Sequence, residues 1–283
     1  MPMRYTAGTV NFTIKSMSSS PDYICPLCQS ALHPIGNSLR CDNNHSFDFA
    51  KEGYVHLLPV QMKKSLAPGD DKNMVLARRE FLALGHYQFL RDELAKLVSE
   101  HAPKVLVDLG CGEGYYTSFL QQAQPEAKVY GVDISKPAIK YAAKRNKQVH
   151  YSVATNAHLP FSDDYVDVIA NVFAPLVGKE CRRILKPNGK IITVTPAPQH
   201  LFELKQAIYD SVLLHEAPLA PEGFIITHVK ELEHKVTLET KAALENLLLM
   251  TPFGWKISPE KKNKLLASIP FSVTLNFYLS TYV

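Results

Sequence analysis

Four side chains near the N-terminus combine the residue types and the spacing of a metal site. Cys25 and Cys28 are separated by two residues, Cys41 follows after an interval of twelve, and His45 lies four positions beyond it. Three thiolates and one imidazole at this kind of spacing bind zinc tetrahedrally. The pattern therefore predicts one structural zinc ion, with His33 in the interval as a competing ligand.

A glycine-rich segment carries the second chemical signal. Residues 108–114 read Asp-Leu-Gly-Cys-Gly-Glu-Gly, and they overlap the end of a short apolar run. A glycine-rich turn between a strand and a helix lets the backbone approach a ligand at the helix N-terminus. Asp133 ends the next apolar run, where a carboxylate can bind both hydroxyls of a ribose. Gly110, Gly112 and Asp133 therefore predict a ligand that contains a nucleoside.

The spacing within this segment separates two classes of ligand. Gly114 comes one position early for a dinucleotide-binding fingerprint, and Asp108 precedes the glycines. Together with Asp133, these features resemble class I S-adenosylmethionine (SAM) methyltransferases. The alternatives are an NAD-type fold and a catalytically inactive relative of the methyltransferases.

A third segment, residues 155–161, reads Thr-Asn-Ala-His-Leu-Pro-Phe and follows another apolar run. Many methyltransferases have an Asp at its first position, which contacts the adenine amino group. Thr155 stands there in this chain, so we expect its hydroxyl or a nearby backbone carbonyl to accept that hydrogen bond. The last three residues of the segment are expected to pack in the core.

Basic residues gather after Asp133, and residues 134–162 contain no acidic side chain. Such a patch beside a ligand-binding edge is either a solvated helix face or a contact for RNA phosphates. The candidates for RNA contact are Lys136, Lys140, Lys144, Arg145 and Lys147, with Lys63, Lys64, Arg78 and Arg79 as further ones.

The elements that position these residues alternate between short apolar runs and helical periods. This alternation predicts right-handed crossovers and a parallel sheet that is covered on both faces. The predicted strands are residues 105–109, 128–132, 149–153, 165–173 and 190–195, and the predicted helices between them include 116–124 and 136–146.

Two further regions flank this alternating zone. Residues 72–100 have helical spacing, which Gly85 divides into two helices. The tail predicts long strands at 224–236 and 271–282, typical of a late antiparallel hairpin at the edge of an open sheet. We therefore expect an α/β protein with the class I SAM-dependent methyltransferase fold. Its Rossmann-like, mostly parallel seven-stranded sheet is preceded by a small zinc-binding module.

The domain organisation follows from these patterns. Residues 1–22 are expected to be a loose leader and 23–62 the zinc-binding module. Residues 63–283 are expected to be the methyltransferase domain, with a helical lead-in at 63–102. The chain has 283 residues, of which 46% are hydrophobic and 20% charged, so its composition is globular.

Charge and cysteine content restrict the partners and the compartment. A net charge of +4 is too small to indicate a nucleic-acid or membrane binder by itself. Five cysteines, three of them clustered, favour a reducing compartment and metal binding. Because no apolar run approaches the ~20 residues that a bilayer needs, we expect a cytoplasmic protein without a membrane partner.

Several unusual short motifs occur in one order along the chain, together with the zinc pattern and the glycine-rich segment. They are Ala-Lys-Glu-Gly-Tyr at 50–54, Leu-Leu-Pro-Val at 57–60, Gly-His-Tyr-Gln at 85–88, Lys-Pro-Asn-Gly at 186–189, Thr-Pro at 195–196, His-Leu-Phe-Glu-Leu at 200–204 and Met-Thr-Pro-Phe at 250–253. With these motifs the chain resembles the 23S ribosomal RNA guanine-N1 methyltransferase family (RlmA). The resemblance runs from about Tyr23 to the C-terminus.

The resemblance implies a SAM-dependent enzyme that methylates N1 of a guanine in a hairpin loop of 23S rRNA. It implies that the zinc module helps to hold the RNA, and it leaves a homodimer open. It also implies cofactor contacts at Tyr87, Gly112, Glu113 and His200. With the motif residues, the predicted cofactor-binding set is Tyr87, Gly110, Gly112, Glu113, Asp133, Thr155 and His200.

The catalytic groups are less well defined. Guanine N1 carries a proton at neutral pH, so a general base or hydrogen bonds to the guanine O6 would assist methyl transfer. The side chains expected at the carboxyl edge of the sheet include Asn171, His200 and Glu203, and none is singled out as the base. Phe173 is expected either to stack on the target base or to pack in the core.

Two other functions stay open at this point. The chain would be a SAM methyltransferase that acts on another RNA or on a small molecule. Alternatively, it would be a non-catalytic zinc-ribbon adaptor that binds RNA, although the intact Gly110, Gly112 and Asp133 count against this.

Overall fold

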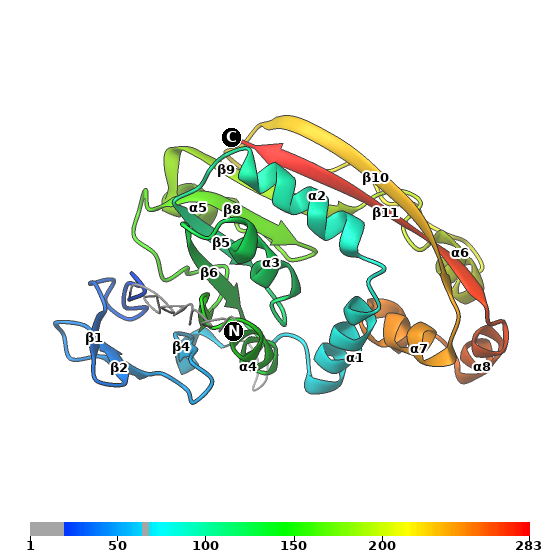
Figure 1. Cartoon of the computed structure of the whole chain (residues 1–283), viewed down its shortest axis with the longest axis horizontal. Coiled ribbons are helices and arrows are strands. Elements are labelled where there is room, and N and C mark those ends of the chain that lie inside the picture. The colour runs from blue at the N-terminus through cyan, green and yellow to red at the C-terminus, as the bar shows by residue number, and fades with distance from the viewer. Residues whose placement is uncertain (1–19, 64–67) are drawn as a thin grey trace, which may run out of the picture.

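The computed structural model describes residues 20–63 and 68–283 (Figure 1). Most of the expected leader, and the RNA-contact candidate Lys64, lie outside the described residues. None of the helices in the described part of the chain is both long and apolar enough to cross a membrane.

A small antiparallel sheet forms the N-terminal region, at the lower left of Figure 1. Its strands have only three residues each: β1 His33–Ile35, β2 Ser38–Arg40 and β3 Ser46–Asp48. Most of their side chains are exposed, with Leu39 fully buried. Three such strands bury too little apolar surface to fold alone, so this region needs other sources of stability.

The main sheet has eight strands in the order β10-β11-β9-β8-β5-β6-β7-β4. The order places β5 centrally, and β11 is antiparallel to both of its neighbours, β9 and β10. Seven of these strands are the predicted ones, and the short β4 adds an eighth from within the segment expected to be the zinc-binding module. The strands are β4 Val55–His56, β5 Val105–Leu109, β6 Lys128–Asp133, β7 His150–Val153, β8 Val166–Val172, β9 Leu185–Pro196, β10 Ile226–Leu238 and β11 Phe271–Tyr282.

Helices α1 and α2 lie between β4 and β5 in the chain, and a left-handed glycine separates them as predicted. Gly85 has a φ of +84°, which few other residues adopt. The Asp71 carboxylate caps α1 by accepting hydrogen bonds from the N–H groups of Asn73 and Met74. The helices are α1 Lys72–Ala83, α2 Gln88–Ser99, α3 Tyr115–Ala123, α4 Lys136–Arg145, α5 Gly178–Ile184, α6 Phe202–Ile208, α7 Lys241–Leu249 and α8 Pro259–Ala267, with 3-10 turns η1 Val60–Met62 and η2 Pro252–Trp255.

The two faces of the main sheet are covered in different ways. Alternate residues of β5 point to opposite faces, so Leu106 joins one buried cluster and Val107 joins the other. The first cluster takes its partners from α1, α2, α3, α4, α6 and α7. The second takes them from α5 and from the N-terminal region. Within this second cluster, the ring of Tyr23 from the N-terminal region lies 5.3 Å from the ring of Tyr130 of β6.

The C-terminal hairpin carries a helical insertion. Strands β10 and β11 pair along their whole length, and α7, η2 and α8 lie between them in the chain. Figure 1 shows α7 beside α1, and many residues of these two helices are in contact. Phe277 of β11 points into the first buried cluster, so the hairpin contributes to the same core as α1 and α2.

Candidate metal centre and cofactor site

The four predicted zinc ligands lie together. Sγ of Cys25 and Sγ of Cys41 are 3.5 and 3.4 Å from Nδ1 of His45, and Sγ of Cys28 is 3.6 Å from Sγ of Cys41. All four ligand atoms lie within 4.8 Å of one another. A tetrahedral zinc ion holds sulfur and nitrogen ligands about 3.5–3.8 Å apart. The residues therefore fit zinc, and the competing ligand His33 is not in the group.

Two similar turns present these ligands. In the first, the N–H of Gln29 donates to the carbonyl of Cys25 at 2.8 Å, which folds the chain around Cys28. In the second, the N–H of Asn44 donates to the carbonyl of Cys41 at 2.9 Å. Gln29 and Asn44 are both left-handed, with φ of +62° and +64°. Each turn thus supplies one pair of ligands, as the spacing predicted.

The glycine-rich loop after β5 is built for close approach of the backbone. Gly110, Gly112 and Gly114 all have positive φ, which disfavours residues with side chains. A Cβ on Gly110 would lie 2.2 Å from Cβ of Ala174, and one on Gly114 would lie 2.8 Å from the Tyr151 hydroxyl. A Cβ on Gly112 would meet no atom closer than 3.9 Å. Gly112 is therefore the least crowded of the three glycines, and the Arg78 guanidinium is its nearest partner from a distant part of the chain.

Asp133 lies beside this loop at the end of β6. Its Oδ2 accepts a hydrogen bond from the N–H of Gly112 at 2.9 Å, and its Oδ1 accepts one from the N–H of Ser135 at 2.7 Å. These two bonds fix the carboxylate next to Gly112. Its position suits the predicted contact with a ribose.

Asp108 and Tyr116 are buried next to the same loop. The Thr117 hydroxyl donates to Oδ2 of Asp108 at 2.6 Å. Among the described residues, Oδ1 of Asp108 and the Tyr116 hydroxyl have no hydrogen-bond partner. Burial raises the pKa of Asp108 to about 7, and the nearby Asp133 contributes to the rise. Unpaired buried polar atoms are costly, which favours a ligand that brings polar groups to this site.

Glu113, a predicted cofactor contact, already has a partner within the chain. Its side chain is buried and forms an ion pair with Arg145 of α4. The Arg145 guanidinium also donates to the Glu113 carbonyl at 3.3 Å, so this candidate for RNA contact already has a partner within the chain. Spacing along the helix does not reveal this pair, which forms between distant parts of the chain.

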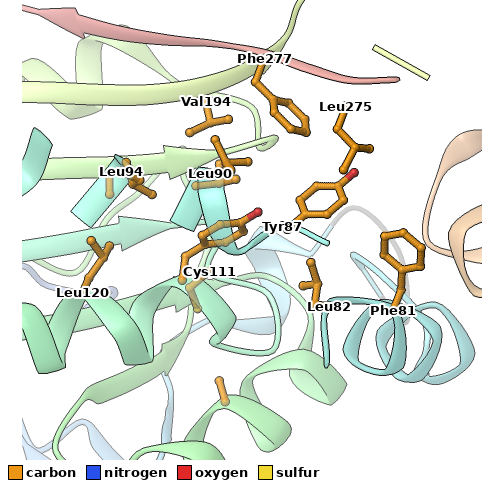
Figure 2. Close-up of a cluster of buried hydrophobic side chains, with 14 of the residues drawn as sticks. Phe81, Leu82, Tyr87, Leu90, Leu94, Cys111, Leu120, Val194, Leu275 and Phe277 are labelled. Atoms are coloured by element: carbon orange, nitrogen blue, oxygen red, sulfur yellow. The ribbon is translucent and has the colours of Figure 1, made fainter. Parts of the chain in front are cut away.

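Tyr87 precedes α2 and is 2% exposed. Figure 2 shows its side chain among Phe81, Leu82, Leu275 and Phe277. Its ring lies 5.4 Å from that of Phe277, and burial raises the pKa of its hydroxyl above the ordinary value. Tyr87 therefore remains a neutral side chain in the wall between α1, α2 and the C-terminal hairpin.

His200 and Phe173 lie together at the carboxyl edge. Their rings are stacked with centroids 6.3 Å apart, and His200 also lies 4.6 Å from the ring of Phe277. His200 is buried, whereas Phe173 is 45% exposed and left-handed, with φ of +57°. Burial, aided by Lys205 and His215, lowers the pKa of His200 to about 3. The imidazole is therefore neutral at physiological pH.

The other candidate base residues already have partners. The side-chain amide of Asn171 donates to the Leu109 carbonyl at 2.9 Å. The Glu203 carboxylate accepts hydrogen bonds from the N–H and the hydroxyl of Thr274, at 2.8 and 2.7 Å. Both side chains therefore hold the sheet edge together. The Thr155 hydroxyl accepts a hydrogen bond from the N–H of Ala157 at 3.3 Å in a short turn.

Comparison with known proteins matches both parts of the chain. Residues 23–66 match the zinc-ribbon family model described as "RlmA, N-terminal", and residues 107–193 match one described as "Methyltransferase domain". The 23S rRNA (guanine(748)-N(1))-methyltransferase of Streptomyces fradiae is 33% identical, and the match covers 87% of this chain and 90% of that protein. The chain belongs to the 23S rRNA (guanine-N1)-methyltransferase family.

Two further relatives of this RlmA-type family carry provisional names as 23S rRNA (guanine-N1)-methyltransferases. The protein from Micromonospora griseorubida is 33% identical over 93% of this chain and 97% of its own length. The protein from Bacillus subtilis is 33% identical over 86% of this chain and 89% of its own length. The family uses SAM and zinc. The Cys₃His group fits zinc, and the glycine-rich loop, beside an Asp108 oxygen that has no partner among the described residues, fits SAM.

Two features of this RlmA-type site were not expected from the sequence. Lys205 of α6 is only 4% exposed, and among the described residues its Nζ has no hydrogen-bond partner. It lies close enough to His200 to lower the pKa of the imidazole, so it belongs to the surroundings of the site. The lysine itself gives no sequence signal of burial, because its environment is set by distant parts of the chain.

The predicted basic face of α4 is only partly free. Nζ of Lys140 is 3.3 Å from the Glu52 carboxylate, and Nζ of Lys147 donates to the Glu52 carbonyl at 2.5 Å. Glu52 lies within the segment that matches the zinc-ribbon model, so these lysines link that segment to the region of α4. Lys144 is exposed and takes no part in these two contacts.

Proposed function

We propose that this protein transfers a methyl group from SAM to N1 of a guanine in a hairpin loop of 23S rRNA. The observation that carries the proposal is Phe173, an exposed aromatic side chain held in a left-handed conformation beside His200. Non-glycine residues with positive φ cluster at functional sites, because the fold must hold them against local strain. The relatives named as 23S rRNA guanine-N1 methyltransferases support the choice of substrate.

The cofactor site in this proposal lies at the carboxyl edge of β5 and β6. The backbone at Gly110 and Gly112 approaches the cofactor, Asp133 binds the ribose hydroxyls and Thr155 lies near the adenine. Tyr87, Glu113 and His200 complete the set implied by the family resemblance. The domain division at residues 23–62 and 63–283 is part of the same proposal.

The chemistry of the step falls mainly on positioning. SAM supplies a methyl group that its sulfonium already activates. The protein holds guanine N1 in line with that methyl, which contributes to the rate through effective molarity. The N1 proton has to leave, and donors near the guanine O6 favour its departure because they stabilise negative charge on the oxygen.

His200 is suited to donate a hydrogen bond rather than to accept the N1 proton. The N–H of Asn276 donates to Nδ1 of His200 at 3.4 Å, so the neutral ring carries its hydrogen on Nε2. The pKa of about 3, which burial lowers, makes this imidazole a weak base. Asn171 and Glu203 are engaged by Leu109 and Thr274. Solvent is therefore the acceptor of the N1 proton in our proposal.

Phe173 provides the surface on which the target guanine stacks. The N1 edge of guanine is paired within a duplex, so the base has to come from a loop or leave its helix. Stacking on an aromatic side chain stabilises such an unpaired base by about 1–3 kcal/mol. The zinc ribbon and exposed lysines, Lys144 among them, hold the surrounding RNA. A cytoplasmic location follows from the rRNA substrate, and a homodimer stays a prediction.

The experiment is methyl transfer to naked 23S rRNA, followed by digestion and identification of the modified nucleoside. The expected product is 1-methylguanosine, formed only when SAM is present. Phe173→Ala should lower the rate by about 10- to 100-fold, because it removes the stacking surface. Leu213→Ala, which changes a side chain that is 86% exposed, is the control and should leave the rate unchanged. Methyl transfer only to another RNA or to a small molecule would contradict the proposal.

A further inference from the structure

We propose that Arg78 binds the carboxylate of the methionine part of SAM. The inference rests on the proposed SAM site and adds a residue to it. The sequence placed Arg78 among the candidates for RNA phosphate contact, because it is one of two adjacent arginines on α1. The structure gives it a different environment.

Arg78 faces the glycine-rich loop. Its Nη1 is 3.9 Å from the point that a Cβ on Gly112 would occupy, and it is the nearest atom to that point outside the neighbouring residues. Gly110 and Gly114 are packed against Ala174 and Tyr151, so Gly112 is the least crowded of the three glycines. Arg78 is its nearest partner from a distant part of the chain.

Two contacts hold the guanidinium in this position. Arg78 forms an ion pair with Asp70 from the loop before α1, and its Nη2 donates to the Met250 carbonyl at 3.3 Å. Its side chain is 28% exposed, so the charge is partly removed from water. A held and partly desolvated guanidinium is an effective partner for a carboxylate.

The methionine part of SAM has a carboxylate, an ammonium and a sulfonium, and its carboxylate needs a cationic partner. The acidic groups at the loop are already engaged, because Asp133 accepts hydrogen bonds from the N–H groups of Gly112 and Ser135, and Glu113 pairs with Arg145. Burial raises the pKa of Asp133 and of Glu113, and the charge of Arg78 opposes the rise at both, so its guanidinium lies near the loop. Arg78 enters from α1 and suits the carboxylate.

The test compares two ligands in full-length, zinc-loaded protein by calorimetry. S-adenosylhomocysteine has the amino-acid part, whereas 5′-methylthioadenosine keeps the nucleoside and lacks that part. Arg78→Gln should weaken S-adenosylhomocysteine roughly 10- to 100-fold and leave 5′-methylthioadenosine within about twofold, because the lost bond is to a charged group. Arg78→Lys keeps the positive charge but lacks the paired N–H donors of the guanidinium, so its loss of affinity for S-adenosylhomocysteine should be intermediate.

Arg79→Gln is the matched control. It removes the same charge one position along α1, but Arg79 is exposed and its guanidinium lies over the ring of Tyr141. It should leave the affinity for both ligands near that of the wild type. A loss as large as that of Arg78→Gln would attribute the effect to net charge and overturn the proposal.

Three further outcomes are decisive. Equal weakening of both ligands by Arg78→Gln would show that Arg78 only supports the loop at Asp70, and would overturn the proposal. Unchanged S-adenosylhomocysteine affinity with weakened binding of 23S rRNA would make Arg78 a phosphate contact and would also overturn it. Failure of the wild type to bind either ligand would instead contradict the proposed SAM site itself.

Discussion

The zinc ribbon and the methyltransferase domain are held together by different forces. The ribbon has strands of three residues, and its one group of converging ligands is Cys25, Cys28, Cys41 and His45. The methyltransferase domain has an eight-stranded sheet with a buried cluster on each face. Metal binding supplies folding free energy where the core is too small, whereas apolar burial supplies it in the larger domain.

The same difference governs how each region reveals its chemistry. The metal ligands are close in sequence and lie on two local turns, so their spacing alone defines the site. The proposed cofactor site draws on α1, the ends of β5, β6 and β9, and the C-terminal hairpin. Ligands that are close in sequence can be recognised as a motif, whereas a site built from distant segments can be recognised only in the folded structure.

Loss of the metal should give the largest effect and should remain within one region. Cys41→Ser should lower the zinc content from about one ion per chain to near zero and disorder residues 23–62. RNA binding should weaken strongly, and SAM affinity should change little because none of the metal ligands belongs to the glycine-rich loop. Metal analysis, limited proteolysis and calorimetry measure these effects. Asp42→Asn, beside the ligands, is the control.

An equal collapse of SAM affinity in Cys41→Ser would break the comparison. It would show that Tyr23 and its contact with Tyr130 transmit the loss into the main sheet. A zinc content near zero in wild-type protein that never met a chelator would contradict the metal site itself.

The converse change is Asp133→Ala in the methyltransferase domain. Loss of the carboxylate leaves two ribose hydroxyls and the N–H of Gly112 without their partner. SAM affinity should fall by about 1–3 kcal/mol, while zinc content and the order of the ribbon stay unchanged. Unchanged affinity in a folded variant, measured by calorimetry, would refute the role of Asp133 in ribose binding.

Asp108 should make the methyltransferase domain sensitive to pH. Burial raises its pKa to about 7, so the folded state keeps a proton that the unfolded state loses near pH 4. The folded state therefore binds more protons between about pH 4 and 7, and its free energy of unfolding falls as the pH rises through that window.

Asp108→Asn should remove most of this pH dependence. The thermal midpoint should rise relative to wild type at pH 8 and differ less at pH 5, when both are measured without SAM. The exposed Asp164→Asn should shift the midpoint equally at both pH values. If the thermal midpoint of the wild type rose from pH 5 to pH 8 as strongly as that of Asp108→Asn, Asp108 would not hold a proton in the folded state.

The smallest effect concerns the junction between the two regions. Lys144 is exposed, whereas Lys140 lies 3.3 Å from the Glu52 carboxylate. If Lys144 contacts an RNA phosphate, Lys144→Gln should reduce the slope of log affinity against log salt by about 0.7–0.9. Lys140→Gln should change it less, since Glu52 already neutralises Lys140. If both variants gave the same slope as the wild type, this face of α4 would be solvated and would not contact RNA.

Most of the fold was predictable because its signals are periodic and local. Alternating apolar runs predicted the seven strands, and Gly85 predicted the break between α1 and α2. The helices α5 and α6 were not predicted, because seven residues are too few for a clear helical period. Strand β4 has two residues and is defined by its pairing with β7 rather than by composition.

The contacts of the site residues were less predictable than the residues themselves. The pair between Arg145 and Glu113 and the burial of Lys205 depend on elements that are distant in sequence. Single-residue types identify chemistry that is possible, but tertiary packing decides which partner each group meets. Phe173 shows the same limit, since its exposure and left-handed backbone emerge only from the folded chain.

The central claim is tested most directly by primer extension on 23S rRNA after incubation with the protein and SAM. Methylation at N1 blocks base pairing, so reverse transcriptase stops one nucleotide before the modified guanine. The account predicts one strong stop at a guanine in a hairpin loop, dependent on SAM and lost with Cys41→Ser and Asp133→Ala. Full-length extension under all conditions, or a stop within a stable duplex, would contradict it.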